Sequence, residues 1–158
     1  MNARVVLIAA GLALASQPLL AQDKKTVLNL ETAKKIAAGC EAKAKAEGWK
    51  MNIAIMDDGG NLKYFLRQDG AYRGSIEVAQ LKATTSSMFP FTTKQIGDLT
   101  KNIPGIAFVP GVVTFEGGLP IKTASGEAIG SIGASGGTAE QDGMCAQAGL
   151  DAAADDLK

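Results

Sequence analysis

The sequence contains no histidine among its 158 residues. This absence excludes hydrolases that need an imidazole base, zinc sites built on histidine, and haem ligated by histidine. It has only two cysteines, Cys40 and Cys145, so neither a Cys-x-x-Cys redox motif nor a four-cysteine zinc site is available. Net charge is also absent, because 16 lysines and arginines balance 16 aspartates and glutamates, which argues against nucleic-acid binding.

The N-terminus has the pattern of a secretory signal peptide. Arg4 precedes an apolar stretch and a short polar stretch, and the small residue Ala21 follows. A membrane anchor is less favoured, because the apolar run is shorter than the ~20 residues that a transmembrane helix needs. We expect cleavage after Ala21, with Ala15 as an alternative, so that residues 1–21 are removed. The remaining residues, 22–158, are expected to form one periplasmic or secreted domain with no membrane span.

Export gives the two cysteines a structural meaning. In an oxidising compartment a pair of cysteines favours one disulfide between Cys40 and Cys145, with two buried free thiols as the alternative. In the chain-entropy model, closing a loop of about 100 residues stabilises the fold by about 4.7 kcal/mol before any native strain is subtracted.

Hydrophobic periodicity in the first half of the chain predicts a helix and a hairpin. Apolar residues recur every three or four positions from Leu30 to Gly48, which is typical of an amphipathic helix with Asn29 as its N-cap. This spacing places Cys40 on the buried face. Alternating apolar residues on both sides of an Asp-Asp-Gly-Gly-Asn turn predict a β-hairpin over 51–67.

The second half predicts helices on either side of an irregular stretch. A helix is expected over 72–87, where Pro90 prevents its continuation, and a short helix is expected after Thr92. The apolar pieces within 106–118 are expected to be strands or strand-edge segments.

The C-terminal part predicts a second hairpin and a last helix. The hairpin is expected to begin at Ile121, and a Thr-Ala-Glu-Gln capping box opens the last helix at Thr138. Cys145 lies on the apolar face of this helix. If the first and last helices pack side by side on one face of an antiparallel sheet, the disulfide is geometrically reasonable.

Three patterns that can carry chemistry are better explained as structure. Gly133–Gly137 fits the Gly-x-Ser-x-Gly nucleophile elbow, but Ser135 has no histidine to act as its base. The same glycines could hold an anion through backbone amides, with plain packing as the alternative. Asp57 and Asp58 are expected turn residues. We assign no catalytic residue, and no metal site because calcium-loop spacing is absent.

The order of these segments resembles one known family. The most specific segments are GEAIGSIGASGGTAEQD at 126–142, KATT at 82–85 and GGLPI at 117–121. From Leu28 to about Leu157 their order is similar to the GlcG/HbpS-like haem-binding family, which is itself similar to the C-terminal domain of PduO-type proteins. The resemblance implies a profilin-like α/β (α+β) fold, in which N- and C-terminal helices pack on an antiparallel sheet of five or six strands. It also implies a homo-oligomer.

The resemblance further implies haem or a related tetrapyrrole as the ligand. Because histidine is absent, another side chain would have to ligate the iron. The candidates are Tyr64, Tyr72, Met51, Met56, Met88, Met144 or a lysine. The haem propionates would pair with Arg73, Lys82 or Lys122.

We expect the ligand site between the second helix and the Gly-Gly-Leu-Pro-Ile turn. Arg73 and Lys82 are nine residues apart in the expected helix, about two and a half turns, so they would serve different ends of a groove. The residues expected to bind the ligand are Arg73, Lys82, Phe89, Glu116, Gly117 and Gly118, with Phe91 beside them. The alternatives are surface or interface ion pairs for the cations and core or interface packing for the phenylalanines.

The leading functional hypothesis is an exported small-molecule-binding protein without a catalytic motif of its own. One alternative is an enzyme acting on a small organic acid or other metabolite, with Lys82 or a carboxylate as its acid–base group. Another is an accessory subunit of a periplasmic dehydrogenase system.

Overall fold

A computed structural model of the chain describes residues 25–158. The predicted signal peptide and both predicted cleavage sites lie outside the described residues. Among the helices of the described part, none combines the length and the apolar character that crossing a membrane requires.

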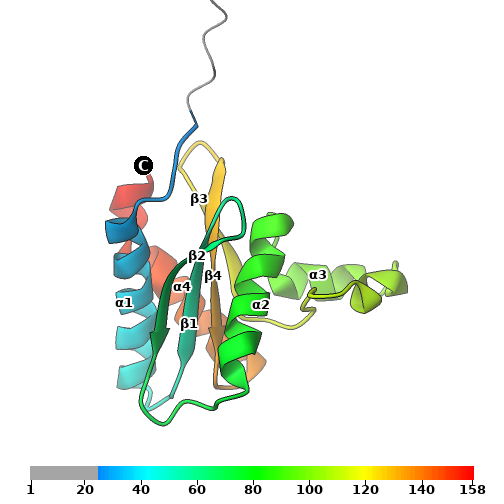
Figure 1. Cartoon of the computed structure of the whole chain (residues 1–158), viewed down its shortest axis with the longest axis horizontal. Coiled ribbons are helices and arrows are strands. Elements are labelled where there is room, and N and C mark those ends of the chain that lie inside the picture. Colours follow the sequence, from blue (N-terminus) through cyan, green and yellow to red (C-terminus); the bar gives the residue numbers. More distant parts are fainter. Residues whose placement is uncertain (1–24) are drawn as a thin grey trace, which may run out of the picture.

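The described residues form one sheet with helices on both of its faces (Figure 1). The elements in chain order are α1 (Leu30–Ala46), β1 (Asn52–Asp57), β2 (Leu62–Arg67), α2 (Ser75–Met88), α3 (Thr93–Leu99), the 3₁₀ helix η1 (Pro104–Phe108), β3 (Gly118–Lys122), β4 (Ala128–Ser135), α4 (Ala139–Ala152) and the 3₁₀ helix η2 (Ala154–Leu157). The sequence correctly predicted the four α-helices and both hairpins, with α2 beginning three residues later than the expected start at 72. The expected turn at Gly-Gly-Leu-Pro-Ile is wrong from Gly118 onward, because Gly118–Lys122 is a strand, β3, that pairs with β4.

The sheet has four strands in the order β2-β1-β4-β3, and every pair is antiparallel. The predicted number of five or six strands is wrong for the described residues. The apolar pieces expected as strands contribute η1 and an irregular segment instead. Pro104 and Pro110 lack an amide donor for a strand ladder, and Gly111 turns the chain with a φ of 81°.

Alternation along the strands separates the two faces of the sheet. Ile53 and Ile55 of β1 belong to the larger buried cluster, which contacts α1 and α4. Ala54, between them, faces α2 and packs with Ala79 and Ala83. A strand buried on both faces is expected where helices cover both sides of a sheet.

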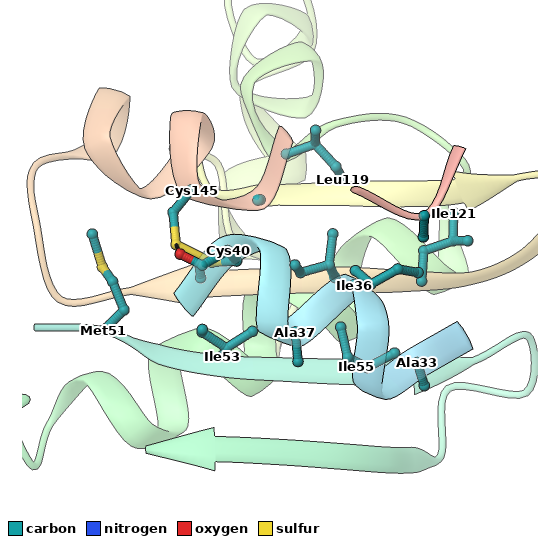
Figure 2. Close-up of a cluster of buried hydrophobic side chains, with 14 of the residues drawn as sticks. Ala33, Ile36, Ala37, Cys40, Met51, Ile53, Ile55, Leu119, Ile121 and Cys145 are labelled. Carbon is teal, nitrogen blue, oxygen red and sulfur yellow. Dashed lines mark hydrogen bonds between the residues drawn. A yellow bond between two sulfur atoms is a disulfide. The ribbon is translucent and has the colours of Figure 1, made fainter. Parts of the chain in front are cut away.

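Helices α1 and α4 lie side by side on one face and approach each other closely at two glycines. A Cβ atom at Gly39 would lie 2.5 Å from Ala152 Cβ, and one at Gly149 would lie 2.5 Å from a backbone oxygen of α1. The predicted disulfide is present here between Cys40 and Cys145, whose Cα atoms are 4.5 Å apart (Figure 2).

Residues 89–117, which we call the arm, follow α2 and project away from the sheet on the far side of this helix (Figure 1). The two hydrophobic clusters of the described residues contain no arm residue. Polar contacts hold the base of the arm instead, because Val113 N donates to Thr85 Oγ1 at 2.9 Å and Gly118 N donates to Thr93 Oγ1 at 3.0 Å.

Candidate functional site

The structure separates the residues that the sequence predicts as one site. Arg73 is exposed just before α2, whereas Lys82 is fully buried in the middle of this helix. Phe89 is exposed immediately beyond the end of α2. Glu116, Gly117 and Gly118 lead from the arm into β3. Their assignment as ligand-binding residues stays a prediction, but the structure shows which of them a ligand can reach.

Lys82 is engaged on every side by its own chain. Its Nζ donates to Asp142 Oδ2 at 2.7 Å and to the backbone oxygen of Ala134 at 3.2 Å. The ring of Phe115 lies over the ammonium group, with the ring centroid 4.7 Å from Nζ. These contacts connect α2, β4, α4 and the arm at one point.

Burial dominates the electrostatics of this pair. It lowers the pKa of Lys82 below its ordinary value, although the hydrogen bond and charge of Asp142 oppose that shift. Burial likewise raises the pKa of Asp142, against the stabilising contact with Lys82 and the amide of Gly137. Removing one partner of such a buried pair strongly destabilises the fold, because the other partner is left as an uncompensated buried charge.

Gly117 and Gly118 make room for the buried lysine. Gly117 has a φ of 128°, and a Cβ atom there would lie 2.5 Å from Lys82 Nζ. Glu116 points the other way and pairs with Lys94 at 3.0 Å in a hollow of about 330 Å³ that Met144 also lines. A ligand in this hollow therefore reaches Glu116 but not Lys82.

The backbone amides at the start of α4, which could hold an anion, are already hydrogen-bonded within the chain. Gly137 N donates to Asp142 Oδ1 at 2.9 Å, and the capping box of Thr138 and Gln141 occupies two further amides. Ser135 is buried at the end of β4, and no basic side chain is bonded to it among residues 25–158. These amides therefore stabilise the β4–α4 turn, and the Ser135 hydroxyl has no activating base beside it in this part of the chain.

The candidate iron ligands differ in how far their side chains are exposed to solvent. Met51 and Met56 are buried, and Tyr64 packs against the larger hydrophobic cluster. The exposed candidates among tyrosine and methionine are Tyr72, Met88 and Met144. Tyr72 is the most exposed of the three, with 72% of its surface accessible.

Tyr72 lines a hollow of about 270 Å³ at the end of the sheet where β1 begins. We call this hollow the aromatic slot; its lining residues are Gly48, Trp49, Lys50, Gly70, Tyr72, Gly136, Gly137 and Gln141. A second hollow of about 330 Å³, which we call the basic groove, is lined by Glu41, Lys45, Lys50, Arg67, Gln68 and Asp69. Because Lys50 lines both, the two hollows adjoin at its side chain.

Local sequence explains why these loops meet. Gly48, with a φ of 74°, lets the chain turn after α1 and brings Trp49 to the start of β1. The buried Gln68 accepts a hydrogen bond from Met51 N at 2.8 Å, so the end of β2 is fastened to the same place. Asn52 Nδ2 donates to the backbone oxygen of Tyr72 at 3.0 Å. The hairpin thus positions Trp49 and Tyr72 on one hollow.

Two cations without an ion pair line the basic groove, and one of them, Lys50, also lines the aromatic slot. Lys45 pairs with Glu41 at 2.8 Å, which neutralises both at one end of the basic groove. Lys50 and Arg67 form no ion pair with an acid of residues 25–158. The arrangement therefore offers aromatic surface, a phenol oxygen and two available cations within adjoining hollows.

The sequence indicates Tyr72 as a possible iron ligand but does not indicate that Trp49, Lys50 and Arg67 lie close to it. One signal was present, since the only tryptophan of the chain stands between a helix-ending glycine and a lysine at the start of the first strand. The hairpin prediction could have placed this segment beside the residues that follow the second strand.

This geometry defines the class of protein: a mixed α/β domain with a four-strand antiparallel sheet, two helices on one face, one on the other, and ligand-sized hollows at the loops. A family model described as "Haem degrading protein HbpS-like" matches residues 28–151. The chain therefore belongs to the HbpS-like family, as the sequence resemblance predicted.

Individual relatives agree with this assignment. Protein GlcG of Escherichia coli is 33% identical over 113 residues, which cover 70% of this chain and 83% of GlcG. The crystal structure of a double mutant of Streptomyces reticuli HbpS has a TM-score of 0.77 at 28% identity, covering 95% of this chain and 97% of that one. The crystal structure of the PduOC:Heme complex has a TM-score of 0.73 at 26% identity, covering 80% and 95%.

Proposed function

We propose that this protein binds haem or a related tetrapyrrole in the aromatic slot and basic groove. The observation that carries the proposal is the exposed phenol of Tyr72, which shares a hollow with Trp49. The HbpS-like family, whose description names haem, and the similarity to the PduOC:Heme complex support this ligand class.

The residues of the slot fit the chemical requirements of haem without a histidine. A tyrosine phenolate is an established axial ligand of haem iron, so Tyr72 would hold the metal. Trp49 offers an aromatic face for the planar ring. Lys50 and Arg67 would pair with the propionates through charge-assisted hydrogen bonds, and the exposed Arg73 beside Tyr72 remains a further propionate partner. Bound haem would supply a redox-active iron centre.

The size of the site also suits a macrocycle. The adjoining hollows measure about 270 and 330 Å³, whereas ligand pockets range from roughly 300 to 1,000 Å³. Rotation of the exposed Lys50 side chain would join them into one groove.

The test is a titration of ferric haem into the purified mature protein, followed by the Soret band. We expect a saturable shift of the Soret band. The dissociation constant should be at least about tenfold higher in the double variant Lys50→Gln and Arg67→Gln, since each charge-assisted hydrogen bond contributes roughly 1.5–3 kcal/mol. Lys94→Gln, at the other hollow, should leave the affinity unchanged.

Two outcomes would overturn the proposal. The first is the absence of any saturable Soret shift by the wild-type protein. The second is a saturable shift that is insensitive to the Lys50 and Arg67 variants but weakened by Lys94→Gln, because that result places the ligand at the hollow beside Glu116.

Our proposal is binding without turnover. Lys82, the acid–base group of the enzyme hypothesis, is fully buried and paired, so a substrate would have to displace Asp142 to use it. A slow loss of the Soret band under reducing conditions, dependent on Tyr72, would instead indicate haem degradation. Copurification of a partner protein with an empty slot would favour the accessory-subunit alternative.

We also propose that the chain is exported and that residues 22–158 are the mature domain. A disulfide between Cys40 and Cys145 supports this proposal, because such bonds persist in oxidising compartments. Non-reducing mass analysis of the cell fractions checks both the cleavage site and the bridge. A full-length, reduced protein in the cytoplasm would contradict it.

A further inference from the structure

One buried carboxylate connects the aromatic slot with the interior of the protein. Asp142 lies in the first turn of α4 and is only 2% exposed. Its Oδ1 accepts a hydrogen bond from Gly137 N at 2.9 Å, and its Oδ2 accepts one from Lys82 Nζ at 2.7 Å. Gly137 lines the aromatic slot, whereas Lys82 is fully buried in α2. The two oxygens of one side chain therefore contact two different parts of the molecule.

The part of the slot that Asp142 contacts is closely packed against the residues opposite. Gly136 and Gly137 form this part of the wall, and Trp49 and Lys50 also line the slot. A Cβ atom at Gly136 would lie only 2.1 Å from the backbone oxygen of Lys50. The backbone of the β4–α4 turn therefore lies directly against the segment that carries the tryptophan ring and one of the proposed propionate partners. A shift of Gly136 and Gly137 would change the shape of the slot.

The start of α4 is capped without Asp142. Thr138 N donates to Gln141 Oε1 at 2.9 Å, and Gln141 N donates to Thr138 Oγ1 at 3.3 Å. The hydrogen bond of Asp142 Oδ1 instead holds Gly137, which lies just before the capping residue. An apolar side chain at position 142 would offer this amide no acceptor, so the amide would have to turn toward water. Loss of the carboxylate should therefore move the slot wall while the helix remains capped.

We propose that Asp142 is a positioning residue for the haem site, which fixes Gly136 and Gly137 against the opposite wall of the aromatic slot through its Oδ1 atom. This inference rests on the proposed function, because it assigns Asp142 a role toward the haem that the slot would bind. Residues that hold a binding wall in place commonly affect affinity although they do not contact the ligand. The affinity for haem then depends on a buried carboxylate that haem does not touch.

Two double variants that differ in one hydrogen-bond acceptor test the inference. Lys82→Met with Asp142→Asn removes both buried charges but keeps an oxygen for Gly137 N, whereas Lys82→Met with Asp142→Leu removes the charges and the oxygen. Haem titration should give wild-type affinity for the asparagine double variant. In the leucine double variant the dissociation constant should rise about three- to tenfold, the effect of losing one hydrogen bond. Glu140→Gln, which removes a negative charge from the same turn of α4, is the matched control and should leave the affinity unchanged.

The fluorescence of Trp49 gives a second readout that needs no haem. Trp49 is the only tryptophan of the chain and lines the slot, so its emission reports the shape of the slot directly. The leucine double variant should have a red-shifted emission maximum and stronger acrylamide quenching, because a displaced wall lets more water reach the ring. The asparagine double variant and Glu140→Gln should match the wild-type protein.

Stability measurements separate positioning from a merely structural role. Lys82→Met alone destabilises the fold, because Asp142 stays buried without its cation, yet it keeps the oxygen that accepts from Gly137 N. If Asp142 only supported the fold, slot fluorescence and haem affinity would follow the urea midpoint, and this single variant would be the most affected. The inference predicts the reverse order, with the more stable leucine double variant the most affected at the slot. Far-ultraviolet circular dichroism confirms that each variant is folded.

Three results would overturn the inference. They are wild-type Trp49 emission and quenching in the leucine double variant, an asparagine double variant perturbed as strongly as the leucine one, or unchanged haem affinity in a variant whose Trp49 emission has moved. A wild-type protein without a saturable Soret shift would instead overturn the proposed function. The Trp49 comparison would still decide whether Asp142 positions the slot, so the two failures are distinguishable.

Discussion

Glycines at the helix and sheet contacts of the body are tightly packed, whereas Gly105 and Gly111 in the outer part of the arm face open space. A Cβ atom at Gly133 would collide with the backbone of α2, and one at Gly39 would collide with α4. At Gly105 and Gly111 of the arm, nothing lies within 4 Å of such an atom. In the body, small residues let elements approach closely enough to bury their apolar side chains.

Apolar side chains show the same contrast. Ile53, Ile55 and Ile132 are fully buried in the body, while Ile103, Phe108 and Val109 are exposed in the arm. The body therefore buries most of its large apolar side chains within the chain, whereas much of the apolar surface of the arm is exposed in a single chain. The predictions below test that difference, from the largest expected effect to the smallest.

The largest effect is expected at the buried pair that anchors the arm to the body. Lys82→Ala should lower the free energy of unfolding by about 3–5 kcal/mol, because it leaves Asp142 buried without its cation. Replacing both partners, with Lys82→Met and Asp142→Leu, should recover most of the loss. Urea unfolding followed by circular dichroism measures both. An equal loss in the single and double variants would contradict this account.

The same pair predicts opposite pH dependences for the two single variants. In Lys82→Met, burial keeps the pKa of Asp142 above its ordinary value of 3.8, so the folded state holds the proton more tightly and stability rises as the pH falls. In Asp142→Leu, burial keeps the pKa of Lys82 below 10.5, so stability rises as the pH increases. Urea midpoints measured across pH check both signs, and parallel profiles would contradict them.

A somewhat smaller effect is expected at the α1–α4 contact. Replacing Cys40 and Cys145 together by alanine should lower the free energy of unfolding by about 2–4 kcal/mol, since the disulfide restricts the unfolded chain. Thermal and urea unfolding of the variant provide the measurement. Unchanged stability would mean that close packing at the helix crossing suffices without the bond.

The smallest effect is expected at the tip of the arm. Phe108→Ser should change the unfolding free energy of the monomer by no more than about 0.5 kcal/mol, because this side chain is exposed in a single chain. The measurement is made at high dilution, where assembly adds no stability by mass action. A loss of several kcal/mol would show that the arm belongs to the folding core.

Local sequence signals predicted the body well and the arm poorly. Thr138 and Gln141 form the expected capping box, and the turn after Asp57 joins the expected hairpin. These features depend on neighbouring residues. No strand forms between residues 106 and 117, since the two apolar pieces of that segment are short and are bounded by proline and glycine on both sides.

Long-range partners explain what the sequence could not show about the site. Lysine is almost never fully buried without a partner, and the partner of Lys82 is Asp142, 60 residues further along the chain. Likewise Trp49 and Tyr72 share a hollow only because the hairpin brings the start of β1 to the end of β2. Periodicity identifies each element but not which loops meet.

The ferric spectrum of the haem-loaded protein tests the proposed function most directly. With Tyr72 as the iron ligand, resonance Raman spectra should contain tyrosinate vibrations and electron paramagnetic resonance a high-spin signal. The tyrosinate vibrations should be lost in Tyr72→Phe, and both features should be kept in Tyr64→Phe, whose site packs against the core. A wild-type spectrum without tyrosinate character, or one that Tyr72→Phe leaves unchanged, would contradict the account.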